Sequence, residues 1–217
     1  MLHTRFKHLI SYQLRATSMK DLLEKVEPYR KALIRVGKIL RSKGIDFVLI
    51  GSLIIPLFYK IPWDVHDVDL FILNKSVFAE SDFFEEIARE NDWDVGTTMY
   101  GQVYYEVLVN GDIVRVDLME NMLDVYIPEQ ILKNAPTRRV DDLEIKHIRL
   151  EDLIVLKARE ATQEGDEFLS KLAEVLAEDR YDVRLDKDYI KEIIKLFPED
   201  EQQSIYKRIL RSGIYIE

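Results

Sequence analysis

The chain has 217 residues, of which 47% are hydrophobic and 33% are charged. This composition excludes disorder over most of the chain and fits one domain, with or without a helical appendix. The formal net charge of −9 argues against a general nucleic-acid binder with a basic surface, and the absence of Cys excludes disulfides, thiolate metal sites and cysteine nucleophiles. A chain without Cys is typical of a reducing compartment, so we expect a cytoplasmic location.

No membrane contact is expected, because the longest stretch without a charge covers only residues 47–59, and a bilayer span needs about 20 residues. Residues 1–18 lack the apolar core of a secretory signal and are expected to be a frayed extension or an upstream start before Met19. Only 8 Gly and 6 Pro, many charges and no Cys together indicate a thermophilic source.

The first predicted element is an amphipathic helix over residues 20–43, where apolar side chains recur every three or four positions. Residues 46–50 follow as a short apolar run that is typical of a buried strand. Gly51 and Ser52 end this strand. We expect a short helix over residues 53–59, with Ser52 as its N-cap.

A second strand is predicted over residues 67–73. Side chains alternate between the two faces of a strand, so Asp67 and Asp69 point to the same side. The following residues 76–90 predict a helix with Ser76 as its cap.

Two β-rich segments, residues 102–109 and 112–119, are joined by an Asn-Gly pair, the strongest short signal for a β-hairpin. A two-residue turn aligns the last residue of the first strand with the first residue of the second. This register places Asp117 opposite Tyr104.

Residues 138–148 predict a further hairpin, after which the chain is helical. The sequence therefore predicts an α+β domain over residues 19–148 and a C-terminal helical region over residues 149–217. Four helices are expected in the second region, over residues 150–161, 166–178, 186–197 and 198–211.

Asp67, Asp69 and Asp117 form the most informative pattern, because three carboxylates on strands repel one another unless a cation offsets the charge. Carboxylate oxygens are the ligands that Mg²⁺ prefers. Two such ions can hold both the attacking and the leaving oxygen of a phosphoryl displacement. The pattern therefore favours two Mg²⁺ ions, with Mn²⁺ as an alternative, although Asp117 could instead pair with Arg115.

Gly51 and Ser52 favour a phosphate site beside these acids. A glycine lets the backbone approach an anion closely, and a helix that begins there would present free N–H groups to it.

Residues 50–52, 67–70 and 116–118 together resemble the signature of the polymerase-beta-type nucleotidyltransferase superfamily. Residues 148–157 resemble the helix that opens the helical half of the abortive-infection-type nucleotidyltransferase toxins. The resemblance implies a small mixed β-sheet flanked by helices, the nucleotidyltransferase fold, followed by a C-terminal helical region. It also implies transfer of a nucleoside monophosphate from a nucleoside triphosphate to an acceptor hydroxyl, with release of pyrophosphate.

The resemblance further implies a role for each site residue. Asp67 and Asp69 would bind both metal ions, and Asp117 would bind the catalytic ion and activate the acceptor hydroxyl. Gly51 and Ser52 would hold the triphosphate, and Lys157 would reach the nucleotide.

Three alternatives stay open. The chain could be a toxin that modifies RNA and is neutralised by an antitoxin-type protein partner, a non-catalytic protein that binds a nucleotide or a protein, or a phosphohydrolase that uses the same acids. The acceptor could be RNA, a protein or a small molecule, because a fold does not dictate its substrate.

Overall fold

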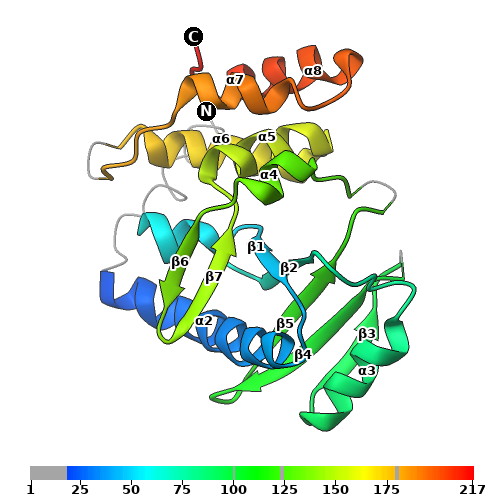
Figure 1. The fold of residues 1–217 in the computed structure, drawn as a ribbon. Helices are drawn as coiled ribbons and strands as arrows, with labels where there is room; N and C mark the ends of the chain where they lie inside the picture. Colours follow the sequence, from blue (N-terminus) through cyan, green and yellow to red (C-terminus); the bar gives the residue numbers. More distant parts are fainter. Residues whose placement is uncertain (1–18, 100, 123–124, 179–180) are drawn as a thin grey trace.

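The computed structural model describes residues 19–99, 101–122, 125–178 and 181–217 (Figure 1). The expected extension over residues 1–18 lies outside these ranges. The strands are β1 (Phe47–Ile50), β2 (Asp67–Ile72), β3 (Asp94–Thr97), β4 (Val103–Val109), β5 (Asp112–Met119), β6 (Thr137–Val140) and β7 (Leu143–His147). They form one sheet in the order β3-β4-β5-β2-β1-β7-β6.

The sheet is mixed, because β2 pairs with β5 and β1 pairs with β7 in parallel, whereas the other neighbours are antiparallel. The helices are α2 (Met19–Ser42), the π-helix η1 (Ile55–Tyr59), α3 (Ser81–Glu90), α4 (Glu129–Lys133), α5 (Leu150–Glu160), α6 (Gln163–Leu176), α7 (Lys187–Ile194) and α8 (Glu199–Arg211). This arrangement confirms the predicted mixed sheet flanked by helices.

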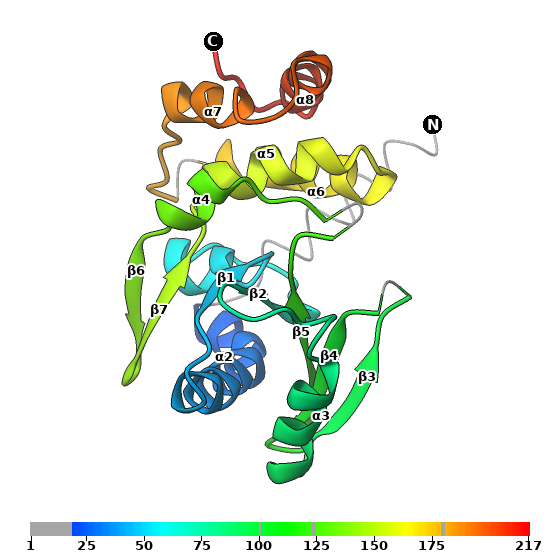
Figure 2. The same ribbon diagram turned by 45° about the vertical axis from the view of Figure 1, so that its right-hand side comes forward.

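Helix α2 packs on β2, β4, β5 and β7, and α3 packs on β3 and β4. Helix α5 contacts α6, α7 and α8, and Figures 1 and 2 show these four helices stacked together at one end of the molecule. In the part of the chain that the structure describes, each helix is too short or too polar to cross a membrane.

The two faces of the β4–β5 hairpin differ. The hydroxyl of Tyr105 donates a hydrogen bond to the carbonyl oxygen of Phe84 in α3 at 2.9 Å, so Tyr105 faces the helices. Because side chains alternate, Tyr104 and its cross-strand neighbour Asp117 lie on the opposite face. The carboxylates therefore occupy the face that α2 and α3 leave uncovered.

The hairpin register is confirmed to the residue, with Val109 opposite Asp112 and Tyr104 opposite Asp117. Asn110 and Gly111 have φ values of 54° and 97°, the positive angles that a type I′ turn requires. The predicted strands 46–50 and 67–73 and the second hairpin are confirmed within about two residues, an ordinary spread for element boundaries.

The predicted cap at Ser52 is wrong. The helix that follows is a π-helix, and its N-cap is Ile54 without a side-chain hydrogen bond. Pro56 has no N–H and cannot make the α-helical bond to the carbonyl of Ser52. That carbonyl accepts instead from the backbone N–H of Ile55 at 3.1 Å.

The predicted start of a helix at Ser76 is also wrong, because α3 begins at Ser81. Ser76 closes a turn, in which its hydroxyl accepts from the N–H of Ala79. The carboxylate of Glu120, which follows β5, accepts from the Ser76 hydroxyl and from the N–H of Phe78. A contact distant in sequence therefore holds these residues out of the helix.

Helix α6 begins three residues before the predicted start at residue 166, because the hydroxyl of Thr162 caps it by accepting from the N–H of Gly165. Strand β3 and helix α4 were not predicted. Strand β3 is a four-residue edge strand with mostly exposed residues, and α4 has only five residues. Neither is long enough to carry a clear periodic signal.

Candidate active site

The three predicted carboxylates meet on the uncovered face of the sheet. Strand β2 places Asp67 and Asp69 two residues apart, and the parallel register sets Asp69 opposite Asp117 of β5. One carboxylate oxygen from each residue lies within 4.8 Å of the other two. Asp117 is buried, whereas Asp67 and Asp69 are half-buried. The structure thus brings together side chains from two strands that are almost 50 residues apart in sequence.

Asp117 also has a resident cationic partner, Arg115. The guanidinium Nε donates to both carboxylate oxygens of Asp117 at 3.0 and 2.9 Å, and Nη2 donates to Oδ1 at 2.6 Å. The same guanidinium lies 4.1 Å from the ring centroid of Tyr104. Asp117 therefore pairs with Arg115 and also belongs to the acidic cluster.

Repulsion within the cluster shows in the pKa values of its acids. Burial, together with the charges of Asp67 and Asp117, raises the pKa of Asp69 well above its ordinary value. Burial and the charge of Asp117 also raise the pKa of Asp67, against the opposing charge of Arg115. The cluster therefore favours either protonation or a bound cation.

Gly51 stands directly beside the cluster, one residue after Ile50, which pairs with Asp69. Its φ of 73° is in the left-handed region, and a Cβ built there would overlap the Asp69 carboxylate. Gly51 is therefore needed both for the turn and for space. The hydroxyl of the neighbouring Ser52 makes no hydrogen bond to any described residue and is half-buried.

Lys157 reaches the site from α5. It lines a cavity of about 160 Å³ that Gly51 and Asp69 also line, and its charge opposes the raised pKa of Asp69. Its ammonium group forms an ion pair with Glu160 at 2.8 Å. All six residues predicted for the site thus lie in one region of the structure. In the sequence, by contrast, Lys157 follows the two aspartates of β2 by more than 80 residues.

The cavity beside Lys157 contains residues to which the sequence analysis gave no role. Its lining includes the apolar Met119 and Leu156, together with Tyr126 and Arg159. Arg159 donates to Glu201 at 2.7 Å and lies 5.4 Å from the ring of Tyr126. No local pattern marks Tyr126 or Arg159, because their proximity arises only when α8 and the segment after β5 pack around α5.

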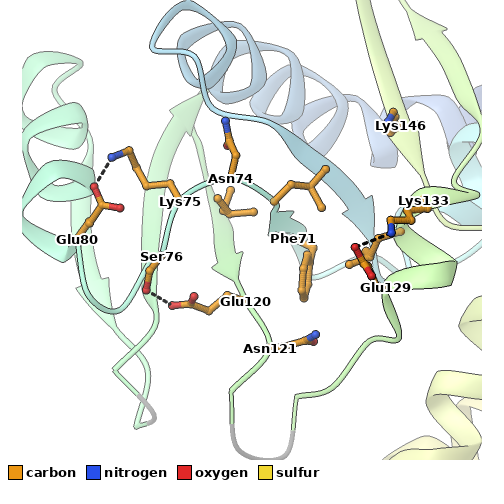
Figure 3. A pocket seen from close by; sticks show the side chains of 13 residues that line it. Phe71, Asn74, Lys75, Ser76, Glu80, Glu120, Asn121, Glu129, Lys133 and Lys146 are labelled. Atoms are coloured by element: carbon orange, nitrogen blue, oxygen red, sulfur yellow. Dashed lines mark hydrogen bonds and ion pairs between the residues drawn. The ribbon is translucent and has the colours of Figure 1, made fainter. Parts of the chain in front are cut away.

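A larger cavity of about 670 Å³ begins further along β2, at Phe71 (Figure 3). None of the predicted site residues lines it. Its acidic groups are engaged by neighbours, with Glu129 paired to Lys133, Glu80 to Lys75, and Glu120 bonded to Ser76. Of these two cavities, the larger is therefore lined by none of the three carboxylates, and the smaller is lined by Asp69.

The acidic cluster fits a divalent cation. It offers three hard oxygen ligands on one face, and these oxygens are close enough to share an ion. Without a cation, repulsion between the carboxylates makes their charged forms costly. The donor set contains no imidazole or thiolate, which favours a hard ion over zinc.

Comparison with known proteins matches most of the chain to one family. Residues 29–211 match the model of a family described as "Nucleotidyl transferase of unknown function (DUF2204)". Among curated proteins, the replicase large subunit of Tomato mosaic virus (strain S-1) is 26% identical over 186 residues, which cover 84% of this chain but only 11% of the viral protein.

Among solved structures, an antigenic nucleotidyltransferase-like protein from Paracoccidioides brasiliensis has a TM-score of 0.56 at 14% identity, over 85% of this chain and 88% of the fungal chain. A complex of ANT(2'')-Ia with adenylyl-2''-tobramycin has a TM-score of 0.41 at 11% identity, over 84% of this chain and 97% of that one. The fungal likeness shows a shared fold and confirms the nucleotidyltransferase fold expected from the sequence.

Proposed function

We propose, from the premise that this chain belongs to the DUF2204 family of nucleotidyl transferases, that it transfers a nucleoside monophosphate from a nucleoside triphosphate to an acceptor hydroxyl. The observation that carries this proposal is that one carboxylate oxygen from each of Asp67, Asp69 and Asp117 lies within 4.8 Å of the others, with Gly51 packed against Asp69. A carboxylate cluster beside a tight glycine turn suits a metal-bound triphosphate.

Asp67, Asp69 and Asp117 would hold Mg²⁺, or two Mg²⁺ ions, through their facing oxygens. The ion supplies charge stabilisation for the phosphoryl oxygens and for the leaving pyrophosphate. Little covalent chemistry remains for the protein, whose residues act mainly by position and charge.

The triphosphate would lie along Gly51, where the absence of a Cβ leaves the backbone accessible. Ser52 would donate its free hydroxyl to a phosphate oxygen. Lys157, which lines the same cavity, would add a positive charge. Gly51 and Ser52 belong to the turn after β1, and Lys157 belongs to α5. The nucleotide would therefore bind between the sheet and the helices.

In the transfer step the acceptor oxygen attacks the α-phosphorus, and the bond from that phosphorus to the oxygen that bridges to the β-phosphorus breaks. The electron pair of this bond leaves with pyrophosphate. Asp117 would accept the proton of the acceptor hydroxyl, because its carboxylate belongs to the cluster at which the acceptor and the metal ion would meet.

The base of the nucleotide would occupy the apolar part of the smaller cavity, against Met119, Leu156 and Tyr126. A cavity of about 160 Å³ is well below the 300–1,000 Å³ typical of sites that enclose a whole ligand. The cavity would therefore enclose the base alone, with the triphosphate along the part of its lining that Gly51, Asp69 and Lys157 form.

The direct test is transfer of label from each α-labelled nucleoside triphosphate, with Mg²⁺, to RNA, to protein extract or to small hydroxylated molecules. Wild-type protein should form a labelled product and pyrophosphate, and the Asp67→Asn/Asp69→Asn double variant should not. An Asp94→Asn variant, altered at an exposed acid of β3, should retain full transfer. Equal labelling by the wild type and the double variant would contradict the assignment.

A further inference from the structure

We infer that Arg115 is the built-in counter-ion of the acidic cluster and that it competes directly with the metal ion for Asp117. The inference rests on the proposed function, because it presupposes that the cluster binds a divalent cation. It assigns to Arg115 a role in setting metal affinity, beyond the pairing of one arginine with one aspartate.

The geometry of the pair supports direct competition. Three hydrogen bonds of 2.6–3.0 Å reach both oxygens of Asp117, so the guanidinium engages each possible ligand atom of that carboxylate. A metal ion shared with Asp67 and Asp69 needs one of these same oxygens. Because the ion and the guanidinium are both positive, they cannot share that carboxylate without strong repulsion.

Arg115 can withdraw without disturbing the core. Its side chain is 43% exposed, whereas that of Asp117 is 11% exposed, so the guanidinium lies on the solvent side of the carboxylate. The ring of Tyr104 forms a second support for the guanidinium at 4.1 Å. Removal of the Tyr104 ring should therefore loosen Arg115 and favour the metal.

A second cation near the cluster provides a matched comparison. The charge of Lys157 acts on Asp67 and Asp69, but its ammonium group is bonded to Glu160 and makes no hydrogen bond to the cluster. Arg115 and Lys157 therefore carry the same charge near the same acids, and only Arg115 occupies a ligand atom.

The experiment measures the affinity of the full chain for Mn²⁺ alone, without nucleotide, by electron paramagnetic resonance of free Mn²⁺. Arg115→Gln should bind Mn²⁺ at least tenfold more tightly than the wild type, and Lys157→Gln should change the affinity less than threefold. Equal effects of the two variants would mean that only general electrostatics acts, and would overturn the inference. Weaker binding by Arg115→Gln would also overturn it, since Arg115 would then hold Asp117 in place for the metal.

Tyr104→Leu tests the same point without a change of charge, and should tighten Mn²⁺ binding about threefold or more by loosening Arg115. Arg115→Lys keeps the charge but not the forked contact, and should fall between the wild type and Arg115→Gln. Circular dichroism in excess Mn²⁺ checks that each variant is folded. Loss of Mn²⁺ binding in the wild type would contradict the proposed metal site itself, whereas binding that is unchanged in Arg115→Gln would contradict this inference alone.

Discussion

The carboxylate of Asp69 lies against the backbone of Gly51, in the space that a side chain at residue 51 would need. Strand β1 ends one residue before Gly51, so the turn that follows the strand packs directly against the Asp69 carboxylate. A change at either residue moves the other.

Gly51→Ala should lower both stability and metal-dependent transfer. The substitution combines a strained φ of 73° with overlap of the Asp69 carboxylate. Gly44 is a matched control, because its φ is also 73° but nothing lies within 4 Å of an added Cβ. Gly44→Ala should cost about 1 kcal/mol of unfolding free energy and leave transfer unchanged. Urea unfolding and label transfer check the pair, and equal losses in both variants would contradict the fit of Gly51 to Asp69.

Asp69→Asn should make the metal-free protein more stable while abolishing transfer. Burial and two neighbouring carboxylates raise the pKa of Asp69, so its charged form opposes folding near neutral pH. The neutral amide removes that repulsion, and the gain should be about 1 kcal/mol or more. Urea unfolding in EDTA and in Mg²⁺ tests this, with Asp94→Asn as the control. Stabilisation by Mg²⁺ should be large in the wild type and nearly absent in Asp69→Asn.

Lys157→Gln should raise the KM for the nucleoside triphosphate by about 10- to 100-fold, the effect expected for loss of one charge-assisted hydrogen bond. The residue lines the cavity together with Gly51 and Asp69, so its charge acts where the triphosphate would lie. Lys191→Gln on α7, where the side chain pairs with Asp188 of the same helix, is the control. Steady-state kinetics measure both, and an unchanged KM in Lys157→Gln would remove Lys157 from the site.

Stability should also depend on pH through Asp152, which is 1% exposed at the start of α5. Burial raises the pKa of this carboxyl to about 6, although the N–H of Arg149 and the hydroxyl of Tyr189 donate to it. An acid whose pKa is raised on folding binds its proton more tightly in the folded state. Its contribution is therefore present below about pH 4 and is lost as the pH rises through 6.

The isosteric variant Asp152→Asn should remove this dependence. The free energy of unfolding of the wild type should fall, relative to that of the variant, by up to about 3 kcal/mol between pH 4 and pH 7. Urea unfolding across this range gives the difference directly. Parallel curves for the two proteins would show that Asp152 is not the titrating group.

Local patterns in the sequence were sufficient for much of the site. Alternation along a strand placed Asp67 and Asp69 on one face, and the Asn-Gly turn fixed the register that sets Asp117 opposite Tyr104. These features depend on residues close in the chain, where the backbone geometry follows from residue type.

Other features depended on long-range packing. Nothing local requires β5 to lie beside β2 in the register that sets Asp117 against Asp69, or α5 to bring Lys157 to the cavity. The turn at Ser76 likewise depends on Glu120, more than 40 residues away. The sequence by itself determined that Asp67 and Asp69 share a face of one strand, because side-chain alternation is local. Only the tertiary structure decided that Asp117 and Lys157 join them, because strand order and helix packing bring together segments that are distant in the chain.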